Sequence, residues 1–389
     1  MKQWSSIIAA SLLLPAVFSI RVIAQTQTPA GAIALEQQGK LQESAQAWNA
    51  VIAHNPKDAA AFASLGVVLA KQQKYAEATS AYRKALALNA QLPGIELNLG
   101  LAEFKQGHFP AAATALHSAL AADSSNMQAC TLLGMSYYGE KKFTLAARYL
   151  ETAAKADPAN AELHQMLAQS CLWAKKFDCA NEQFHQVLEQ NPNSAQAHIL
   201  FGEALDGLGR THEAIAEFEA ASKISPNEPN LHFGLGYLYW KSQQYDQAKP
   251  ELERELAIDP SHAQALAYLG DIEWKNDHAD AALPLLKRAM KINHVLRIVY
   301  VDLAAAYAQQ KDYKNEQVAL QRAVELDPTQ PDAHYQLGRL YQTLGNKAAA
   351  EKELSRVQEL HKKAEKQAEE NLASKMATSP PALNPAETR

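Results

Sequence analysis

Apolar residues recur along this chain at intervals of three and four positions, which is the spacing of one face of an α-helix. In residues 229–262, Leu235 and Tyr239 share one such face, and Ala248 and Leu252 share a second. The pattern predicts two amphipathic helices in this stretch, packed against each other through their apolar faces.

The helix pair repeats every 34 residues, and small residues mark this period most clearly. Glycine occupies seven of the marks and alanine two: Gly66, Gly100, Gly134, Ala168, Gly202, Gly236, Gly270, Ala304 and Gly338. Alanine follows twelve residues after every mark except one, which carries Glu316, and proline follows 24 residues after five of them. Nine units without an insertion, from Ala59 to Ala364, predict an array of structural repeats.

The small residues and the prolines have physical explanations. We expect the Gly or Ala of each first helix to face the Ala of the second helix, so that the two backbones approach closely. Proline is expected to end the second helix, because it has no amide hydrogen and disfavours helical conformation in the residue before it.

The segments "LGYLYWKSQQYDQAKPELERELAIDP" and "LGMSYYGEKKFTLAARYLETAAKADP" resemble the tetratricopeptide repeat (TPR). The resemblance covers residues 59–364 and gives nine repeats: 59–92, 93–126, 127–160, 161–194, 195–228, 229–262, 263–296, 297–330 and 331–364. It implies an all-α fold, a right-handed superhelical solenoid of antiparallel helix pairs. In this family the first helices line a concave groove that usually holds a polypeptide.

Both ends of the array depart from the repeat. Residues 25–58 form a degenerate TPR-like unit that keeps Trp48 and Pro56 in phase. Towards the other end a narrow apolar stripe continues amid dense charge, which predicts that the last helix extends over residues 365–374 and caps the array. Residues 375–389 are rich in Pro and are predicted to be disordered.

Residues 1–24 have the features of a secretory signal peptide. A Lys precedes an apolar run over residues 7–20, and Val22 and Ala24 are the small residues of a cleavage site. The run is too short to span a bilayer, so we predict cleavage after Ala24, no transmembrane span in the mature chain, and export to the periplasm or the medium. Arg21 is atypical so close to the cut, which leaves an uncleaved anchor as the alternative.

Charge and motif content narrow the function classes. The net charge is −5, so no basic excess exists to neutralise phosphates, and we predict no nucleic-acid partner. Phosphate-binding, zinc-protease, serine-hydrolase and calcium-binding motifs are missing from the sequence, and we predict no enzymatic activity, no cofactor and no metal. The G-x-G of Gly234 and Gly236 follows no predicted strand. The repeat explains Gly236 and leaves Gly234 without a role.

Histidine recurs at the fourth position of four repeats, as His164, His198, His232 and His334. Successive copies in a stack of helix pairs lie about 10 Å apart. That is too far for shared binding of one zinc ion, whose nitrogen ligands lie at about 2.0–2.1 Å. We therefore interpret these histidines as contacts between repeats.

The three cysteines do not form a zinc-binding pattern. Cys171 and Cys179 flank the turn between the two helices of one repeat. A disulfide between them is geometrically possible in an oxidising compartment, and two buried thiols are the alternative. Cys130 has no evident partner.

The resemblance places positions 5, 9 and 12 of each first helix on the concave face. In repeat 229–262 these are Phe233, Tyr237 and Trp240. The candidate partner-binding residues are Phe104, Tyr138, Trp173, Phe233, Tyr237, Trp240, Asp271, Trp274, Tyr335 and Arg339. Since Trp and Tyr are frequent interface anchors and acidic residues lie among them, we expect a groove suited to apolar and basic segments. Burial of the rings against neighbouring repeats is the alternative.

One partner class of the family is not supported. The carboxylate clamp of chaperone-binding TPRs uses Lys and Asn at positions 5, 6 and 9, and here position 5 never holds Lys and position 6 holds Asn only at Asn98. The sequence predicts a non-enzymatic scaffold or adaptor in the cell envelope that binds a protein or peptide. The alternative is an assembly factor or ligand-binding subunit of an envelope polysaccharide or outer-membrane biogenesis system, because aromatic rings also stack on sugars.

Overall fold

The structure, a computed structural model, describes residues 28–378, with side chains up to residue 370. Twenty α-helices, α2 to α21, and no strands occupy this range, as the repeat pattern predicts. The predicted signal peptide, residues 1–24, lies outside the described residues, as does the tail beyond residue 378.

Contacts among the helices divide the chain into two units, Met1–Arg210 and Thr211–Arg389. The first unit contains α2 (Pro29–Gln37), α3 (Leu41–His54), α4 (Ala59–Lys71), α5 (Tyr75–Leu88), α6 (Ile95–Lys105), α7 (Phe109–Ala122), α8 (Met127–Gly139), α9 (Phe143–Ala156), α10 (Ala161–Trp173), α11 (Phe177–Gln190) and α12 (Ala195–Gly207). The second contains α13 (Thr211–Ile224), α14 (Leu231–Lys241), α15 (Tyr245–Ile258), α16 (Ala263–Lys275), α17 (Ala279–Ile292), α18 (Arg297–Gln309), α19 (Tyr313–Leu326), α20 (Pro331–Thr343) and α21 (Lys347–Thr378). The last helix continues beyond the expected end at residue 374, and the first proline after it in the sequence is Pro380.

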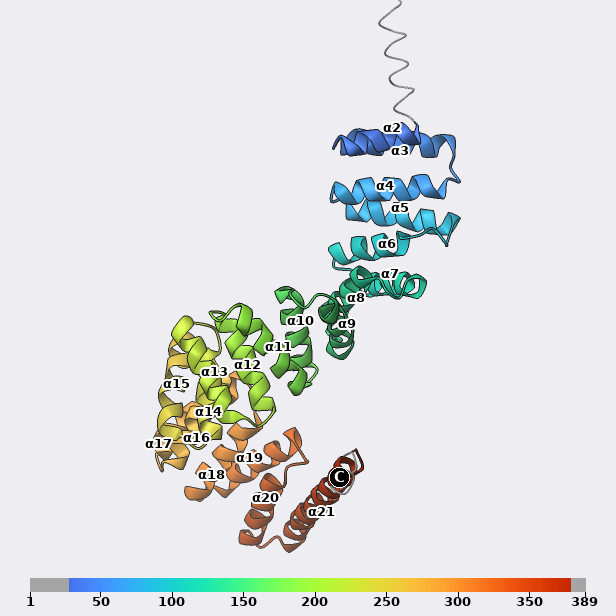
Figure 1. Cartoon of the computed structure of the whole chain (residues 1–389). Helices are drawn as coiled ribbons and strands as arrows, with labels where there is room; N and C mark the ends of the chain where they lie inside the picture. Colours follow the sequence, from blue (N-terminus) through green and yellow to red (C-terminus); the bar gives the residue numbers. More distant parts are fainter. Residues whose placement is uncertain (1–27, 379–389) are drawn as a thin grey trace, which may run out of the picture. The chain divides into compact units, whose positions relative to one another are not determined.

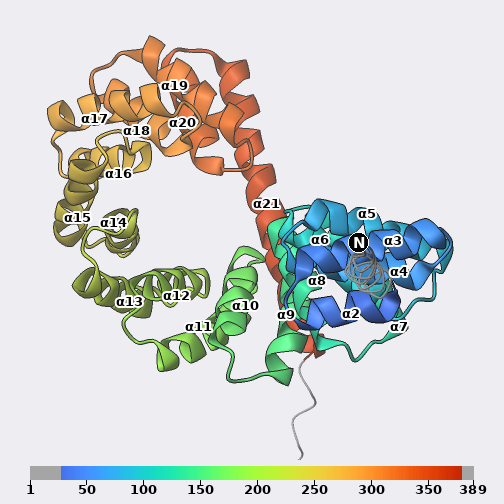
Figure 2. The ribbon, with the colours of Figure 1, turned by 90° about the horizontal axis from the view of Figure 1, so that it is seen from above.

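Even-numbered helices are the first helices of the repeats and odd-numbered helices are the second. Figure 1 shows the pairs α2/α3, α4/α5 and α6/α7 in chain order along the first unit. In the second unit α14 contacts α16, and α16 contacts α18. Figure 2 shows these three helices on the inner side of that unit, with α15 and α17 on the outer side. The first helices of successive repeats therefore share one face.

Local signals explain where the helices begin and end. A polar residue caps several first helices of the first unit, and its side chain accepts a hydrogen bond from the amide three residues ahead. These caps are Asp58, Asn126, Asn160 and Ser194, with distances of 2.9–3.2 Å. Helix α9 ends at Ala156, two residues before Pro158, which confirms that proline marks the end of a second helix.

The repeat glycines make room for a different residue than expected. A Cβ atom on Gly236 would lie 2.8 Å from Cγ of Leu252, and one on Gly66 would lie 2.4 Å from the ring of Tyr82. Both neighbours follow sixteen residues after the glycine, not twelve. The Ala248 carbonyl oxygen would lie 3.3 Å from the Cβ atom on Gly236. The backbone at Ala248 thus approaches Gly236 closely, as expected, and the side chain that fills the space is the leucine sixteen residues after the glycine.

Gly234, two residues earlier, makes room on another side of the helix. A Cβ atom there would lie 2.2 Å from Cε1 of Phe218 on α13. Both glycines of the G-x-G thus serve helix packing.

One turn position of the repeat takes the left-handed backbone conformation. It is the fifteenth residue, between the two helices, and four repeats place glycine there: Gly39, Gly107, Gly209 and Gly345. Six repeats place a larger residue there, with φ between 57° and 60°: Gln73, Lys141, Lys175, Gln243, Asp277 and Lys311. The left-handed conformation costs a residue with a Cβ atom about 1–2 kcal/mol. Glycine at these six positions would relieve that strain.

Candidate functional site

A hydrogen bond between consecutive repeats recurs on the first-helix face of both units. The Tyr138 hydroxyl donates to Oε1 of Gln169 at 2.7 Å. Trp240 donates from Nε1 to Oδ2 of Asp271. Donor and acceptor are 31 residues apart in both pairs, at position 12 of one repeat and position 9 of the next. This bond locates two aromatic clusters, one in each unit.

The cluster in the second unit comprises Phe233, Tyr237, Trp240 and Tyr268, and we call it the Trp240 cluster. Ring centroids of Tyr268 lie 4.6 Å from Trp240, 5.4 Å from Tyr237 and 6.1 Å from Phe233. All four side chains are partly buried, and Phe233 and Trp240 pack on a buried apolar group that includes Leu252. Packing on this buried group holds the cluster in place, and each ring keeps part of its surface open to solvent.

A buried carboxylate fixes the beginning of the helix that carries this cluster. Asn230, before α14, has a left-handed backbone (φ 62°), and its side chain makes no capping bond. Glu255 of α15 is 2% exposed and accepts a hydrogen bond from the Phe233 amide at 3.0 Å. The His262 ring lies 4.6 Å from that of Phe233. Glu255 therefore accepts the amide hydrogen bond that a capping side chain would accept, and it positions Phe233.

Asp271, which the sequence placed among the groove residues, is buried beneath the Trp240 cluster. It is 3% exposed, and its Oδ2 accepts from Trp240 and from Nζ of Lys275, at 2.5 Å for the lysine. The same ammonium group lies 5.0 Å from the Trp240 ring and 5.4 Å from the Tyr245 ring. These distances allow cation–π attraction. The carboxylate is paired inside the protein, so it is not free for a basic ligand.

Asp302 of α18 is a second buried acid beside this pair. It is 7% exposed, and within the described residues its Oδ2 has no hydrogen-bond partner. Burial and, to a smaller extent, the charge of Asp271 hold the pKa of Asp302 well above its usual range, while Lys275 acts in the opposite direction. Burial also raises the pKa of Tyr268 to about 12, and Tyr237, Asp271 and Asp302 add to that shift. The cluster therefore presents aromatic rings to solvent more than negative charge.

The cluster in the first unit comprises Tyr138, Phe143 and Trp173, and we call it the Trp173 cluster. The Trp173 ring lies 5.5 Å from Tyr138 and 5.0 Å from Phe143. Trp173 is 44% exposed. Phe104, one repeat earlier, contacts Phe109 at 5.7 Å. The structure thus brings Tyr138 and Trp173 together, and it places Phe104 in a contact of its own.

The other candidate residues lie apart from both clusters. Trp274 is partly buried and packs against the apolar core formed by α16 to α20. Tyr335 is 46% exposed, and Nη1 of Arg339 donates to its hydroxyl at 3.3 Å. Trp274 therefore follows the alternative in which the ring packs against neighbouring repeats. Tyr335 and Arg339 form a separate surface pair on α20.

Cys171 and Cys179 are joined in a disulfide, with their Cα atoms 5.8 Å apart. The bond connects the end of α10 to the beginning of α11 and closes the turn that follows Trp173. Cys130 is a buried free thiol, and burial raises its pKa.

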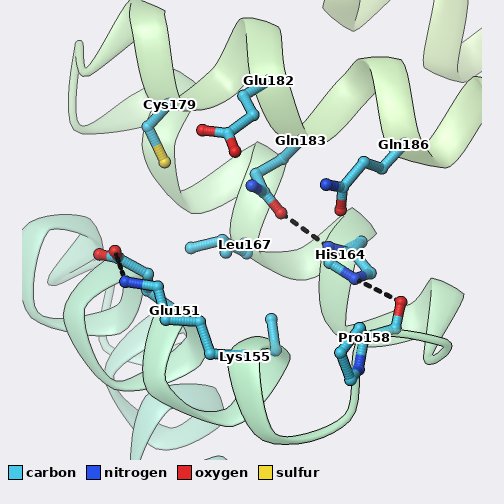
Figure 3. Close-up of a pocket in the computed structure, with 10 residues that line it drawn as sticks. Glu151, Lys155, Pro158, His164, Leu167, Cys179, Glu182, Gln183 and Gln186 are labelled. Carbon is cyan, nitrogen blue, oxygen red and sulfur yellow. Dashed lines mark hydrogen bonds and ion pairs between the residues drawn. The ribbon is translucent and has the colours of Figure 1, made fainter.

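A pocket of about 480 Å³ lies where α9, α10 and α11 meet (Figure 3). Its His164 has Nδ1 2.7 Å from Oε1 of Gln183 and Nε2 3.0 Å from the Pro158 carbonyl oxygen. His232 and His334 make the same contact with the proline carbonyl six residues before them. The recurring histidines link each repeat to the turn before it, so they serve the packing of repeats.

Three residues at the Trp240 cluster were not identified from the sequence: Tyr268, Lys275 and Asp302. Tyr268 and Asp302 occupy position 6 of their repeats, and Lys275 occupies position 13. Positions 6, 9 and 13 are spaced i, i+3 and i+7, which is a second stripe on the same side of a helix. Examining this stripe together with positions 5, 9 and 12 would have found all three.

The described part of the chain contains neither a metal-binding group nor a membrane-spanning helix. Its His, Cys, Asp and Glu side chains form no group of three or more that could hold a metal ion. Among helices α2 to α21, none combines the length and the apolarity that crossing a membrane requires.

Family comparisons match the repeats along most of the chain. Models of the tetratricopeptide repeat match residues 30–93, 97–161, 137–204, 174–232, 207–272 and 299–330, and a model of the TPR repeat matches residues 318–345. Together these matches cover more than half of the chain. No curated protein sequence matches it.

Several solved structures are similar to parts of this chain. MamA (MSR-1) is 26% identical over 42% of this chain and 95% of its own, with a TM-score of 0.39. YrrB, described as a TPR protein with an unusual peptide-binding site, is 23% identical over 46% of this chain and 93% of its own, with a TM-score of 0.38. A chain of the APC/C hetero-tetramer Cut9–Hcn1 is 13% identical over 85% of this chain and 80% of its own, with a TM-score of 0.51, and shows the same fold. With its 34-residue period, its helix pairs and these family matches, the chain belongs to the tetratricopeptide repeat family.

Proposed function

We propose that this chain is a non-enzymatic scaffold of the cell envelope that binds a polypeptide partner on the first helices of its second unit. The Trp240 cluster is the observation that carries this proposal, because four rings from α14 and α16 gather on the face shared by the first helices. Large aromatic side chains that stay partly open to solvent are typical anchors of protein interfaces. The bond from Trp240 to Asp271 holds the indole in place before a partner arrives, which lowers the entropy cost of binding.

The surroundings of the rings indicate the chemistry of the partner. Lys275 neutralises Asp271, and the raised pKa of Asp302 reduces the charge of that acid. The cluster is therefore suited to apolar and aromatic side chains more than to basic ones.

Two observations support a place in the cell envelope. Residues 1–24 have the pattern of a secretory signal peptide. The disulfide between Cys171 and Cys179 is a bond that persists in oxidising compartments and is rare in the cytosol.

Selection from a displayed library of random peptides, with the full chain as bait, tests the binding proposal. We expect selected peptides to bind the variants Tyr237→Ala and Trp240→Ala at least about tenfold more weakly, the loss typical of an interface anchor. Val318→Ala is the matched control, since Val318 is 59% exposed and lies on the second helix α19.

Two outcomes would contradict the proposal. Peptides that bind all variants equally would place the binding site elsewhere on the chain. Saturable binding of oligosaccharides, with no peptide selected, would favour a ligand-binding role in envelope polysaccharide or outer-membrane biogenesis.

A further inference from the structure

We infer that the two turns beside Trp173 form a second binding site, which takes an acidic polypeptide segment. One turn joins α8 to α9 and carries Lys141 and Lys142, and the other joins α10 to α11 and carries Lys175 and Lys176. This site lies in the first unit, so it does not depend on the function proposed for the Trp240 cluster.

The two turns border an open pocket whose lining is partly apolar. The pocket has a volume of about 460 Å³ and is lined by Lys141, Lys142, Phe143, Thr144, Leu145, Trp173, Ala174 and Lys175. Two of its apolar side chains are unusually open to solvent, since Trp173 is 44% exposed and Leu145 is 37% exposed. An exposed indole beside an exposed leucine is a surface that association with an apolar side chain would cover.

The charge around this pocket identifies the kind of segment that fits. Lys142 pairs with Glu140 at 2.7 Å. Lys141 and Lys175 are exposed, and among the described residues neither forms an ion pair. Two unpaired ammonium groups beside an apolar pocket complement a segment in which carboxylates flank an apolar residue.

The repeat itself does not require these lysines. In the second unit position 15 holds Gln243, Asp277, Lys311 or Gly345, and no two successive repeats there both hold lysine. Lys141 and Lys175 also adopt the left-handed conformation, with φ of 60° and 57°, where glycine is more stable. The fold alone would favour glycine at both places, and the pairing of two lysines on successive turns beside one pocket is the feature that an anionic segment would use.

The disulfide fixes the wall of the pocket that carries the indole. Cys171 and Cys179 enclose residues 172–178, which include Trp173 and Lys175. A closed turn loses little further entropy on binding. The disulfide therefore holds Trp173 and Lys175 ready for a ligand.

The geometry around the indole favours a polypeptide over a sugar. The Trp173 ring is tilted by 39° against Tyr138 and by 53° against Phe143, with centroids 5.5 Å and 5.0 Å away. Two tilted neighbours restrict the flat approach that a sugar ring needs for stacking. An apolar side chain can instead contact the exposed parts of Trp173 and Leu145 together.

Fluorescence anisotropy with two labelled peptides tests this site. One peptide alternates glutamate with leucine, the other alternates lysine with leucine, and each is titrated with the full chain. We expect only the acidic peptide to bind, and its affinity to fall as salt is added. The variants Trp173→Ala and Lys175→Gly should each weaken binding at least about tenfold, as truncation of an interface anchor does.

Lys175→Gly separates a binding role from a structural one. It removes a charge and also relieves the left-handed strain, so the melting temperature should rise while the affinity falls. Lys311→Gly is the matched control, because Lys311 has the same turn position and the same φ of 57° in the second unit. It should raise the melting temperature and leave the affinity unchanged.

Three outcomes would overturn the inference. Equal affinities of Lys175→Gly and Lys311→Gly would show that the turn charge is not used. Equal binding of the basic peptide would exclude charge recognition, and binding of polygalacturonate in place of the acidic peptide would assign the site to an anionic polysaccharide. Trp240→Ala should bind the acidic peptide as well as the unmodified chain does, so this test can fail independently of the function proposed above.

Discussion

The Trp173 cluster and its hydrogen bond to Gln169 use four repeat positions, 12 and 17 of one repeat and 9 and 13 of the next, and the same four positions meet at Trp240 in the second unit. In the first unit these positions hold Tyr138, Phe143, Gln169 and Trp173. Tyr138 donates to the neutral amide of Gln169, and Trp173 packs against the two rings. This arrangement contains no charge and ends in an exposed indole.

In the second unit the same four positions hold Trp240, Tyr245, Asp271 and Lys275. Trp240 donates to the carboxylate of Asp271, and Lys275 binds that carboxylate and lies over both rings. Lys275 therefore takes the place that Trp173 takes in the first unit. Positions 9 and 13 therefore differ together between the units. The first unit combines the amide of Gln169 with the indole of Trp173, and the second combines the carboxylate of Asp271 with the ammonium group of Lys275, because a buried carboxylate needs a cation beside it.

The largest expected effect comes from removing the acceptor at position 9 in each unit. Asp271→Ala leaves Trp240 and Lys275 without their partner, and we expect it to lower the free energy of unfolding by about 1.5–3 kcal/mol, the range for bonds to a charged group. Gln169→Ala removes a bond between neutral groups and should cost about 0.5–1.5 kcal/mol. Urea unfolding, followed by circular dichroism, measures both.

Asp271→Asn refines this test, because an amide keeps an acceptor for Trp240 and loses the charge that Lys275 binds. Its loss should lie between those of Asp271→Ala and Gln169→Ala. Equal losses for Asp271→Ala and Gln169→Ala would show that the ion pair adds nothing to the hydrogen bond.

The second effect concerns the disulfide, which only the first unit contains. Replacing Cys171 and Cys179 by Ala frees a turn that spans eight residues, and we expect a loss of about 2 kcal/mol. A reductant should lower the melting temperature of the unmodified chain and leave that of the double variant unchanged. Mass spectrometry after alkylation without reductant is the direct check: labelling of both thiols would show that the bond is not formed.

Much of the fold could be predicted because its signal is local and repeated. Helices α16, α18 and α20 begin at the residues that start the predicted repeats, 263, 297 and 331. The residue that fills the space beside each repeat glycine was not predicted. The spacing suggested the alanine twelve residues later, whereas the side chain of Leu252 occupies the space beside Gly236. The size of a neighbour depends on how the second helix is rotated, and spacing along the chain does not specify that rotation.

The candidate site could be predicted only in part. Phe233, Tyr237 and Trp240 were identified because they fall on one helix face, and the structure places their rings together. The burial of Asp271 was missed because it depends on Trp240, from the preceding repeat, and on Lys275, one turn further along the helix. The position of a residue within its own repeat indicates one face of one helix. The charge of this site depends on residues of three helices, α14, α16 and α18.

A smaller effect comes from Asp302, which has no counterpart under the Trp173 cluster. Its raised pKa means that the folded chain holds the proton more tightly than the unfolded chain does. Stability is therefore lost as the pH rises from the ordinary pKa of an aspartate, about 3.9, towards the raised value in the folded state. Asp302→Asn removes this loss and should raise the melting temperature at pH 7 by about 2–4 °C, the shift expected for roughly 1 kcal/mol in a unit of this size.

The pH dependence distinguishes this cause from simple repacking. The unmodified chain and Asp302→Asn should approach the same stability on acidification towards pH 4, as measured by thermal unfolding across a pH series. A constant difference at every pH would assign the gain to packing and not to the proton.

The smallest effects compare the two indoles directly through Trp173→Phe and Trp240→Phe. Trp240→Phe loses the bond to Asp271 and should cost about 1 kcal/mol, less than Asp271→Ala, because the carboxylate keeps its pair with Lys275. Trp173→Phe removes an indole that is 44% exposed, and a surface substitution of this kind should change the stability by less than about 0.5 kcal/mol. The emission spectrum gives an independent measure, because loss of the exposed indole should shift the remaining tryptophan emission to shorter wavelength. A larger loss from Trp173→Phe than from Trp240→Phe would reverse the comparison, since it would mean that the first unit depends on its indole for folding.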